Sequence, residues 1–203
     1  MTKKKGRKDM NEIIHCIKTR RSCRRFTEEQ LPEKELEAIL EAGRYAPSGG
    51  NNQSCHLLVI QNKSILQELT ELVQQEFSKM EVYEGMYKSI RASILASQKG
   101  KYDFYYNAPT LVVVANKKNY GNAMADSACL LENMMLAAAS LNIGSCWINQ
   151  LRWLDDNQEI REFLKKLGLG EDETVCGSLA LGMKVVDDHE PLKRVGNPVT
   201  YVR

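Results

Sequence analysis

A cluster of four arginines lies near the N-terminus: Arg20, Arg21, Arg24 and Arg25, with Ser22 among them. Guanidinium groups bind phosphate oxygens through paired hydrogen bonds, and a serine hydroxyl adds a neutral donor. The stretch therefore has the chemistry of a phosphate site. A solvated basic patch at the end of a helix is the alternative interpretation of the same residues.

The stretch APSGGNNQSC, residues 46–55, is a second candidate site. Its Pro, Ser, Gly and Asn residues cannot continue a helix, so backbone N–H groups and short amides are available to a polar planar ligand. An ordinary turn into a strand is the alternative. The loop follows a helix and precedes a strand, which is the wrong order for a phosphate-binding glycine loop, and neither GxGxxG nor GxxxxGK occurs in the sequence. A dinucleotide-binding Rossmann domain is therefore unsupported.

Two further stretches have ligand-binding potential. In NIGSCWIN, residues 142–149, a glycine turn leads to Trp147, whose ring either packs near a flat cofactor or fills the core. In EPLKRVGNP, residues 190–198, Lys193 and Arg194 either contact an anion or form a solvated surface pair.

The six cysteines and three histidines have no metal-binding spacing. No two cysteines form a CxxC pair, and the histidines are scattered. Tetrahedral zinc sites usually draw on paired Cys and His residues. We therefore expect no metal, and reduced thiols that lie mostly in the core.

Composition and charge restrict the class of protein. With 203 residues and 43% hydrophobic content, the chain suits one domain. It has no apolar run of the roughly 18 residues that a membrane span needs, and no apolar stretch follows its N-terminal charges, so we expect a cytoplasmic protein. We expect residues 1–9 to form a disordered basic tail and residues 10–203 to form the single domain.

The uneven charge leaves a second class of function open. Residues 1–25 hold ten Lys and Arg against two acids, whereas the rest of the chain has a net charge of −6. A non-enzymatic basic arm that binds nucleic acid is therefore an alternative. Two features weaken it: the sequence pI of about 8.1 is below the value of about 9 typical of such domains, and Phe26 is the only aromatic residue near the arginines.

Hydrophobic periodicity predicts the elements that position these stretches. A second helix should hold Pro32 in its first turn and end near Gly43 and Pro47. The buried helix 124–144 should be capped by Gly144. Further helices are expected at 10–20, 64–80 and 155–168, and strands at 55–61, 110–116, 145–151 and 174–185. Residues 81–107 should be partly helical and the C-terminal tail irregular. Strands and helices mix without strict alternation, which predicts the α+β class.

Five stretches follow one another along the chain: RRSxRxF, APSGGNNQ before an apolar strand, NAPTLVVVA, ADSACLLENMMLAAASLNIGSCWI, and LALGM followed by a Pro-Lys-Arg tail. In this order they resemble the FMN-dependent nitroreductase family. The resemblance covers roughly residues 12–195. It implies a central mixed sheet flanked by helices, and an intertwined homodimer with two FMN sites at the subunit interface. Where the family loop typically continues as Gln-Pro-Trp, this chain has Gln53-Ser54-Cys55.

The resemblance also implies cofactor ligands. Those for the FMN phosphate and ribityl chain are Arg20, Arg21, Ser22 and Arg24, with the basic pair Lys193 and Arg194 returning to the phosphate. The loop residues that reach the flavin, typically from the partner subunit, are Pro47, Ser48, Gly49, Asn51 and Gln53. The stretch along the isoalloxazine ring is Cys146, Trp147 and Ile148. Arg25 lies outside the motif, so we expect a surface residue paired with Glu28 or Glu29.

The activity that the resemblance implies is ping-pong hydride transfer. NADH or NADPH would reduce FMN, which would then reduce a nitroaromatic, a quinone or another conjugated acceptor. No catalytic side chain is expected, because flavin N5 carries the hydride. Residues 81–107 should form a lid or pocket wall that chooses the acceptor. Reductive dehalogenation, flavin fragmentation and enoyl-type reduction are the alternatives within the same fold.

Overall fold

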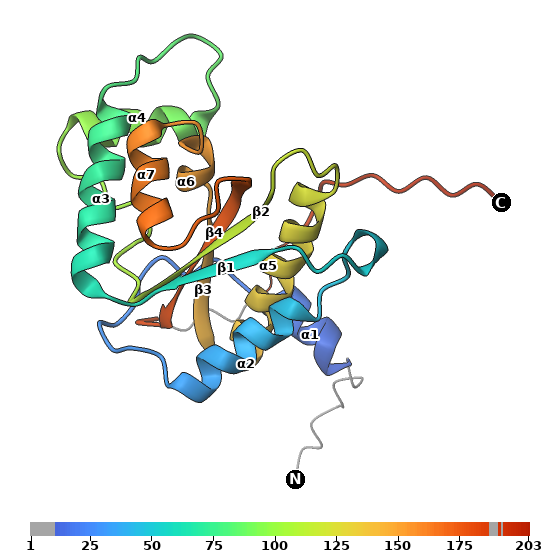
Figure 1. Ribbon diagram of the computed structural model, residues 1–203. Coiled ribbons are helices and arrows are strands. Elements are labelled where there is room, and N and C mark those ends of the chain that lie inside the picture. The colour runs from blue at the N-terminus through green and yellow to red at the C-terminus, as the bar shows by residue number, and fades with distance from the viewer. Residues whose placement is uncertain (1–10, 187–190, 192) are drawn as a thin grey trace.

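Four antiparallel strands form the centre of the molecule, which a computed structural model describes for residues 11–186, 191 and 193–203. They are β1 (His56–Ile60), β2 (Thr110–Lys117), β3 (Ile143–Ile148) and β4 (Glu173–Met183). Their order is β1-β2-β4-β3 (Figure 1). The α+β class is confirmed. The expected mixed sheet is not found among the described strands, because each of their pairings is antiparallel. A parallel pairing occurs as an isolated bridge between Ser22 and Ser145.

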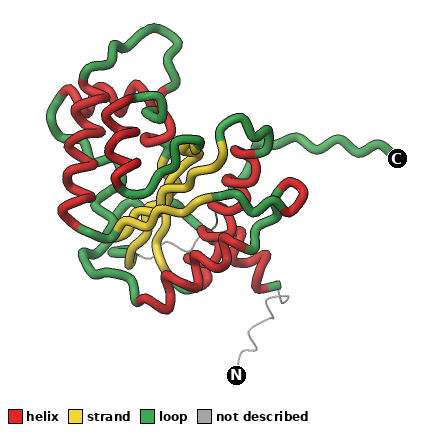
Figure 2. Tube along the Cα trace, viewed as in Figure 1, coloured by secondary structure: helices red, strands yellow, loops and turns green. Residues whose placement is uncertain are grey.

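Helices cover both faces of this sheet (Figure 2). The described helices are α1 (Glu12–Thr19), α2 (Glu33–Arg44), the 3-10 turn η1 (Gly49–Asn51), α3 (Lys63–Ser78), α4 (Lys88–Gln98), α5 (Ala123–Ser140), α6 (Gln150–Trp153) and α7 (Gln158–Lys166). Successive side chains of β2 point to opposite faces of the sheet and contribute to a hydrophobic core on each face. Val113 and Ala115 pack with the core beneath α3, α4, α6 and α7, whereas Val112 and Val114 pack with α2 and α5.

The turn between α5 and β3 differs from the predicted one. The helix ends at Ser140, and Asn142, with a φ of 59°, makes the turn. Gly144 lies inside β3 and caps nothing. A Cβ on Gly144 would lie 2.8 Å from Cγ of Lys184 and 2.9 Å from Sγ of Cys23. This glycine therefore permits close approach of residues 20–27, here called the arginine segment, and is not a cap.

Three other sequence expectations need correction. The helix predicted from residue 155 begins at Gln158, because the Asn157 side chain accepts the N–H of Ile160 and caps it, and the end of the expected strand 145–151 belongs to α6. The six cysteines are free but not mostly in the core. Only Cys146 and Cys176 are buried, and Cys129 is exposed.

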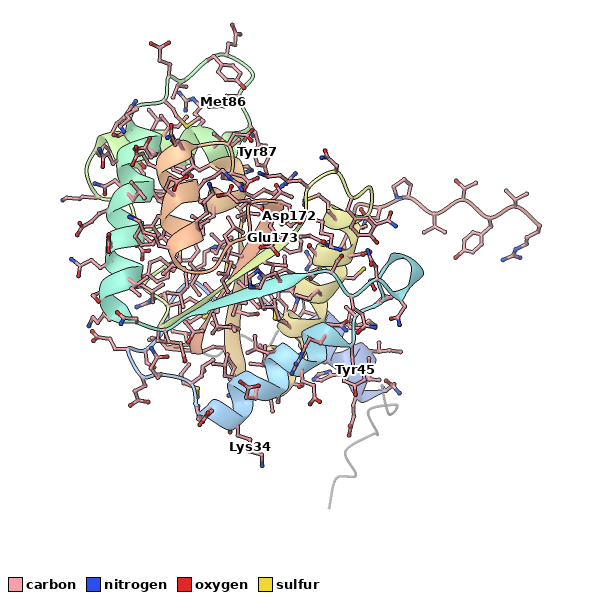
Figure 3. All side chains as sticks on the ribbon, viewed as in Figure 1. Lys34, Tyr45, Met86, Tyr87, Asp172 and Glu173 are labelled. Atoms are coloured by element: carbon pink, nitrogen blue, oxygen red, sulfur yellow. The ribbon has the colours of Figure 1, made fainter. Side chains whose placement is uncertain are left out.

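The segment 81–107 packs as part of the body. It contains α4, and its Met86, Ile94, Phe104 and Tyr105 are buried in the core beneath α3 and α7. In Figure 3, Met86 and Tyr87 lie at the outer end of this helical layer. The described tail, residues 193–203, is irregular as expected and extends from the body (Figure 1). The expected disordered tail, residues 1–9, lies outside the described residues. Among the described helices, none has the length and apolar character to cross a membrane.

Candidate functional site

The arginine segment runs beside the ends of β3 and β4. The N–H of Cys23 donates to the carbonyl of Ser145 at 2.8 Å, and the N–H of Thr27 donates to the carbonyl of Met183 at 2.9 Å. Farther along, the N–H of Val185 donates to the carbonyl of Arg25 at 3.2 Å. These bonds attach the segment to the sheet and bring it against Lys184, which follows β4.

A cavity of about 340 Å³ lies along this segment. Its described lining residues are Thr19, Arg20, Arg21, Ser22, Cys23, Arg24, Arg25, Ala139, Ile143, Gly144, Ser145, Lys184 and Val186. Five of these are cationic, and none of the described lining residues is Asp or Glu. Such a wall attracts an anion strongly, because no carboxylate in the described lining offsets its charge.

Arg20 shows that the cavity has unused hydrogen-bonding capacity. Its side chain is 20% exposed, and its Nε lies 4.0 Å from a carboxylate oxygen of Glu132 on α5. Its Nη1, however, is buried without a hydrogen-bond partner. A buried guanidinium nitrogen without a partner is costly, so the geometry fits an anion that accepts this hydrogen bond.

Other side chains orient Arg24 and Lys184. Nε of Arg24 donates to the Tyr106 hydroxyl at 3.2 Å, and this hydrogen bond raises the pKa of the guanidinium. Nζ of Lys184 donates to Oδ1 of Asn142 at 2.7 Å. The cavity wall therefore combines the arginine segment with the turn before β3 and the residue after β4.

The 46–53 loop lies outside this cavity in the single chain. With Cys55 and residues of α2 and α5, Pro47, Ser48 and Gln53 line a second cavity of about 130 Å³. The N–H of Gly49 donates to Oδ1 of Asp126 at 3.0 Å, which fixes the loop to α5. Asn51 and Gln53 are exposed and adopt left-handed backbone conformations, with φ values of 56° and 50°. The loop is therefore a shaped, accessible surface near Tyr45 at the end of α2 (Figure 3).

None of the other proposed ligands lines the first cavity, although the Cys146 thiol interacts with Ser22, which does. The side chains of Cys146 and Ile148 are buried in the core. Trp147 is partly buried, and its Nε1 donates to Oδ1 of Asn149 at 2.8 Å. Lys193 and Arg194 are exposed on the C-terminal arm. Of the predicted ligands, the cavity thus brings together Arg20, Arg21, Ser22 and Arg24.

Sequence reasoning missed two cations of the cavity wall. Arg25 is exposed, as expected, but it lines the cavity, and Glu28 pairs with Lys63 at 3.4 Å. Lys184 was not proposed at all. It lies near the end of the predicted strand 174–185, and in the structure it directly follows β4 and forms an isolated bridge with Phe26.

Comparisons with known proteins identify the family of the chain. The model of the family described as "Nitroreductase family" matches residues 17–183. A protein of Archaeoglobus fulgidus named "Putative NADH dehydrogenase/NAD(P)H nitroreductase" is 28% identical over 85% of this chain and 86% of its own length.

Two solved structures share most of the fold. A nitroreductase with bound FMN from Bacteroides fragilis is 40% identical, with a TM-score of 0.84 over 96% of this chain and 100% of its own. A nitroreductase with bound FMN from Desulfitobacterium hafniense is 30% identical, with a TM-score of 0.79 over the same shares of both chains.

Proposed function

This chain belongs to the nitroreductase family, and we propose that it is an FMN-dependent oxidoreductase that carries electrons from NADH or NADPH to a conjugated acceptor. The observation that carries the proposal is the cationic cavity. Its wall presents five basic residues, no carboxylate from the described lining residues, and an unpartnered guanidinium nitrogen on Arg20.

The cavity residues suit the phosphate of FMN. A phosphate monoester carries a charge of about −1.5 to −2 at neutral pH and offers three acceptor oxygens. Arg20, Arg21 and Arg24 would donate charge-assisted hydrogen bonds to it, each worth about 1.5–3 kcal/mol. Ser22 would add a neutral donor. When bound, FMN supplies the hydride chemistry, and the protein binds and orients it.

The remaining predicted ligands suit a site completed by a second copy of the chain. In one chain, Pro47, Ser48, Gly49, Asn51 and Gln53 form a separate accessible loop. We assign this loop to the cofactor of the partner subunit. From the family resemblance, we also propose that Cys146, Trp147 and Ile148 lie beside the flavin ring. Lys193 and Arg194 are proposed as phosphate ligands on the same basis.

Exposed apolar surface supports the homodimer. Helix α1 has no buried residue, and Ile13, Ile14 and Ile17 are 68%, 47% and 52% exposed. The C-terminal arm exposes further apolar side chains: Val195, Val199, Tyr201 and Val202. Single exposed apolar residues are ordinary, but a helix face and an extended arm are typical of an association surface.

The proposed acceptor is a nitroaromatic, a quinone or another conjugated compound, reduced in a ping-pong scheme. Residues 81–107 are proposed as the wall that selects it, and a cytoplasmic location remains our expectation.

The test of the proposed function is the visible absorbance of the purified protein. Flavin bands that NADH or NADPH bleaches, and that a nitroaromatic or a quinone restores, would support the proposal. A colourless protein that cannot be loaded with FMN would contradict it.

A further inference from the structure

The last turn of the 81–107 segment contacts the cationic cavity. The Tyr106 hydroxyl accepts a hydrogen bond of 3.2 Å from Nε of Arg24. The guanidinium carbon of Arg24 also lies 5.8 Å from the centre of the Tyr106 ring. One tyrosine therefore meets the arginine through both its hydroxyl and its aromatic ring, and each contact restricts where the guanidinium can point.

The backbone around Tyr106 is held in an uncommon conformation. Tyr106 and Asn107 have φ values of 61° and 49°, in the left-handed region that residues with a Cβ rarely adopt. Oδ1 of Asp103 accepts the N–H of Tyr105 at 3.1 Å. Burial raises the pKa of the Asp103 carboxyl, and the backbone N–H groups of this turn oppose that rise. Strained turns persist where the surroundings fix them, and they gather at functional sites.

The type of side chain that contacts an arginine affects the charge of an anion site. Arg20 lies near Glu132, whose negative charge offsets part of the arginine's field. Tyr106 contacts Arg24 through a phenol and not a carboxylate, so it can orient the guanidinium without placing an acidic side chain at the cavity. The charged guanidinium is further favoured because the hydroxyl raises the pKa of Arg24.

We propose that Tyr106 is a positioning residue for the cofactor, which holds the Arg24 guanidinium at the cavity wall so that the anionic group of FMN meets an oriented cation. The inference rests on the proposed function. Orientation before binding lowers the entropy lost when the ligand orders a flexible side chain, so it strengthens binding without a new ligand contact. It also connects the segment proposed to select the acceptor with the cofactor site.

A double-mutant cycle tests the inference. Tyr106→Phe and Tyr106→Ala are each made in the native chain and in an Arg24→Gln background, and the dissociation constant of FMN is measured by flavin fluorescence. Tyr105→Phe is the matched control, because the neighbouring hydroxyl interacts with Thr70 on α3. Thermal melts establish that each variant is folded, and the mild Tyr106→Phe change keeps the test valid if Tyr106→Ala unfolds.

We expect FMN to bind about 3-fold more weakly to Tyr106→Phe and about 10-fold more weakly to Tyr106→Ala, with both losses below about 2-fold in the Arg24→Gln background. Tyr105→Phe should bind FMN as the native chain does. Equal losses of FMN affinity in both backgrounds would overturn this inference but not the proposed function. A loss in Tyr105→Phe as large as that in Tyr106→Phe would have the same consequence. A native chain that takes up no FMN would overturn the proposed function and the inference with it.

Discussion

At the scale of single residues, Arg20 is the side chain whose geometry most directly predicts a ligand. Its Nη1 is buried without a partner, and it lines the cationic cavity. Arg20→Ala should weaken FMN binding by at least about 10-fold, because one charge-assisted hydrogen bond contributes about 1.5–3 kcal/mol. Equilibrium titration of the apoprotein with FMN measures the loss.

Lys18→Ala is the matched control for Arg20→Ala. Lys18 is an exposed cation in the last turn of α1 and does not line the cavity. The control should bind FMN almost as the native chain does. Arg25→Ala should fall between the two, because Arg25 lines the cavity but is exposed. Equal losses in all three variants would mean that the arginine segment acts only as a diffuse basic patch.

At the scale of elements, Gly144 sets the distance between β3 and the arginine segment. A Cβ there would lie 2.9 Å from Sγ of Cys23 and 2.8 Å from Cγ of Lys184. Gly144→Ala should therefore move the cavity wall, destabilise the fold by about 1–3 kcal/mol and weaken FMN binding. Urea unfolding and FMN titration measure the two effects.

Gly121→Ala is the control for crowding at Gly144. Its Cβ would meet no atom within 4 Å, and its backbone is not left-handed. The control should change neither stability nor FMN affinity appreciably. If Gly144→Ala behaved in the same way, the close approach of the arginine segment to β3 would not matter for the site.

Glu76 connects two helices and gives stability a defined pH dependence. Burial raises the pKa of this carboxyl, but hydrogen bonds from Lys79 and Asn157 outweigh it and leave the pKa lower than usual. A pKa that is lower in the folded state stabilises the protein above the unfolded value, near 4.5, and this contribution is lost as the pH falls. Urea unfolding between pH 6 and pH 4 should therefore show a steeper loss for the native chain than for Glu76→Gln. Identical slopes would contradict the assignment.

Many of the helices and strands could be predicted from the sequence, and the exceptions have physical causes. A run of valines identified β2, an apolar run identified β4, and apolar residues at helical spacing identified α1 and α2. Gly144 was misassigned as a cap because a glycine after a helix usually ends it, whereas here Asn142 adopts the left-handed conformation. Lys184 was not found, because its place at the cavity depends on its pairing with Phe26, which is distant in the sequence.

At the scale of the whole molecule, two groups of predicted ligands line two separate cavities of a single chain. The arginine segment lines one, and three residues of the 46–53 loop line the other. The sequence resemblance supplied both groups of residues, but local patterns cannot say which chain contributes each. The proposed homodimer explains the division, because the loop of one chain can reach the cofactor of the other.

The exposed face of α1 offers a test of the homodimer. Ile17 is 52% exposed on a helix with no buried residue. Ile17→Asp should weaken association, because it places a charge in an apolar interface. Tyr83→Asp is the control, since Tyr83 is 66% exposed on the segment before α4. Sedimentation velocity should show monomer for Ile17→Asp and dimer for Tyr83→Asp. A native chain that sediments as a monomer at all concentrations would contradict the homodimer.

The comparison of FMN with riboflavin tests the central claim most directly, because the two flavins differ only in the phosphate. If the cationic cavity binds that phosphate, two or more charge-assisted hydrogen bonds of about 1.5–3 kcal/mol each should make FMN bind at least about 100-fold more tightly. The same titration on Arg20→Ala should reduce the ratio, chiefly through weaker binding of FMN. Equal dissociation constants for FMN and riboflavin with the native chain would contradict the account.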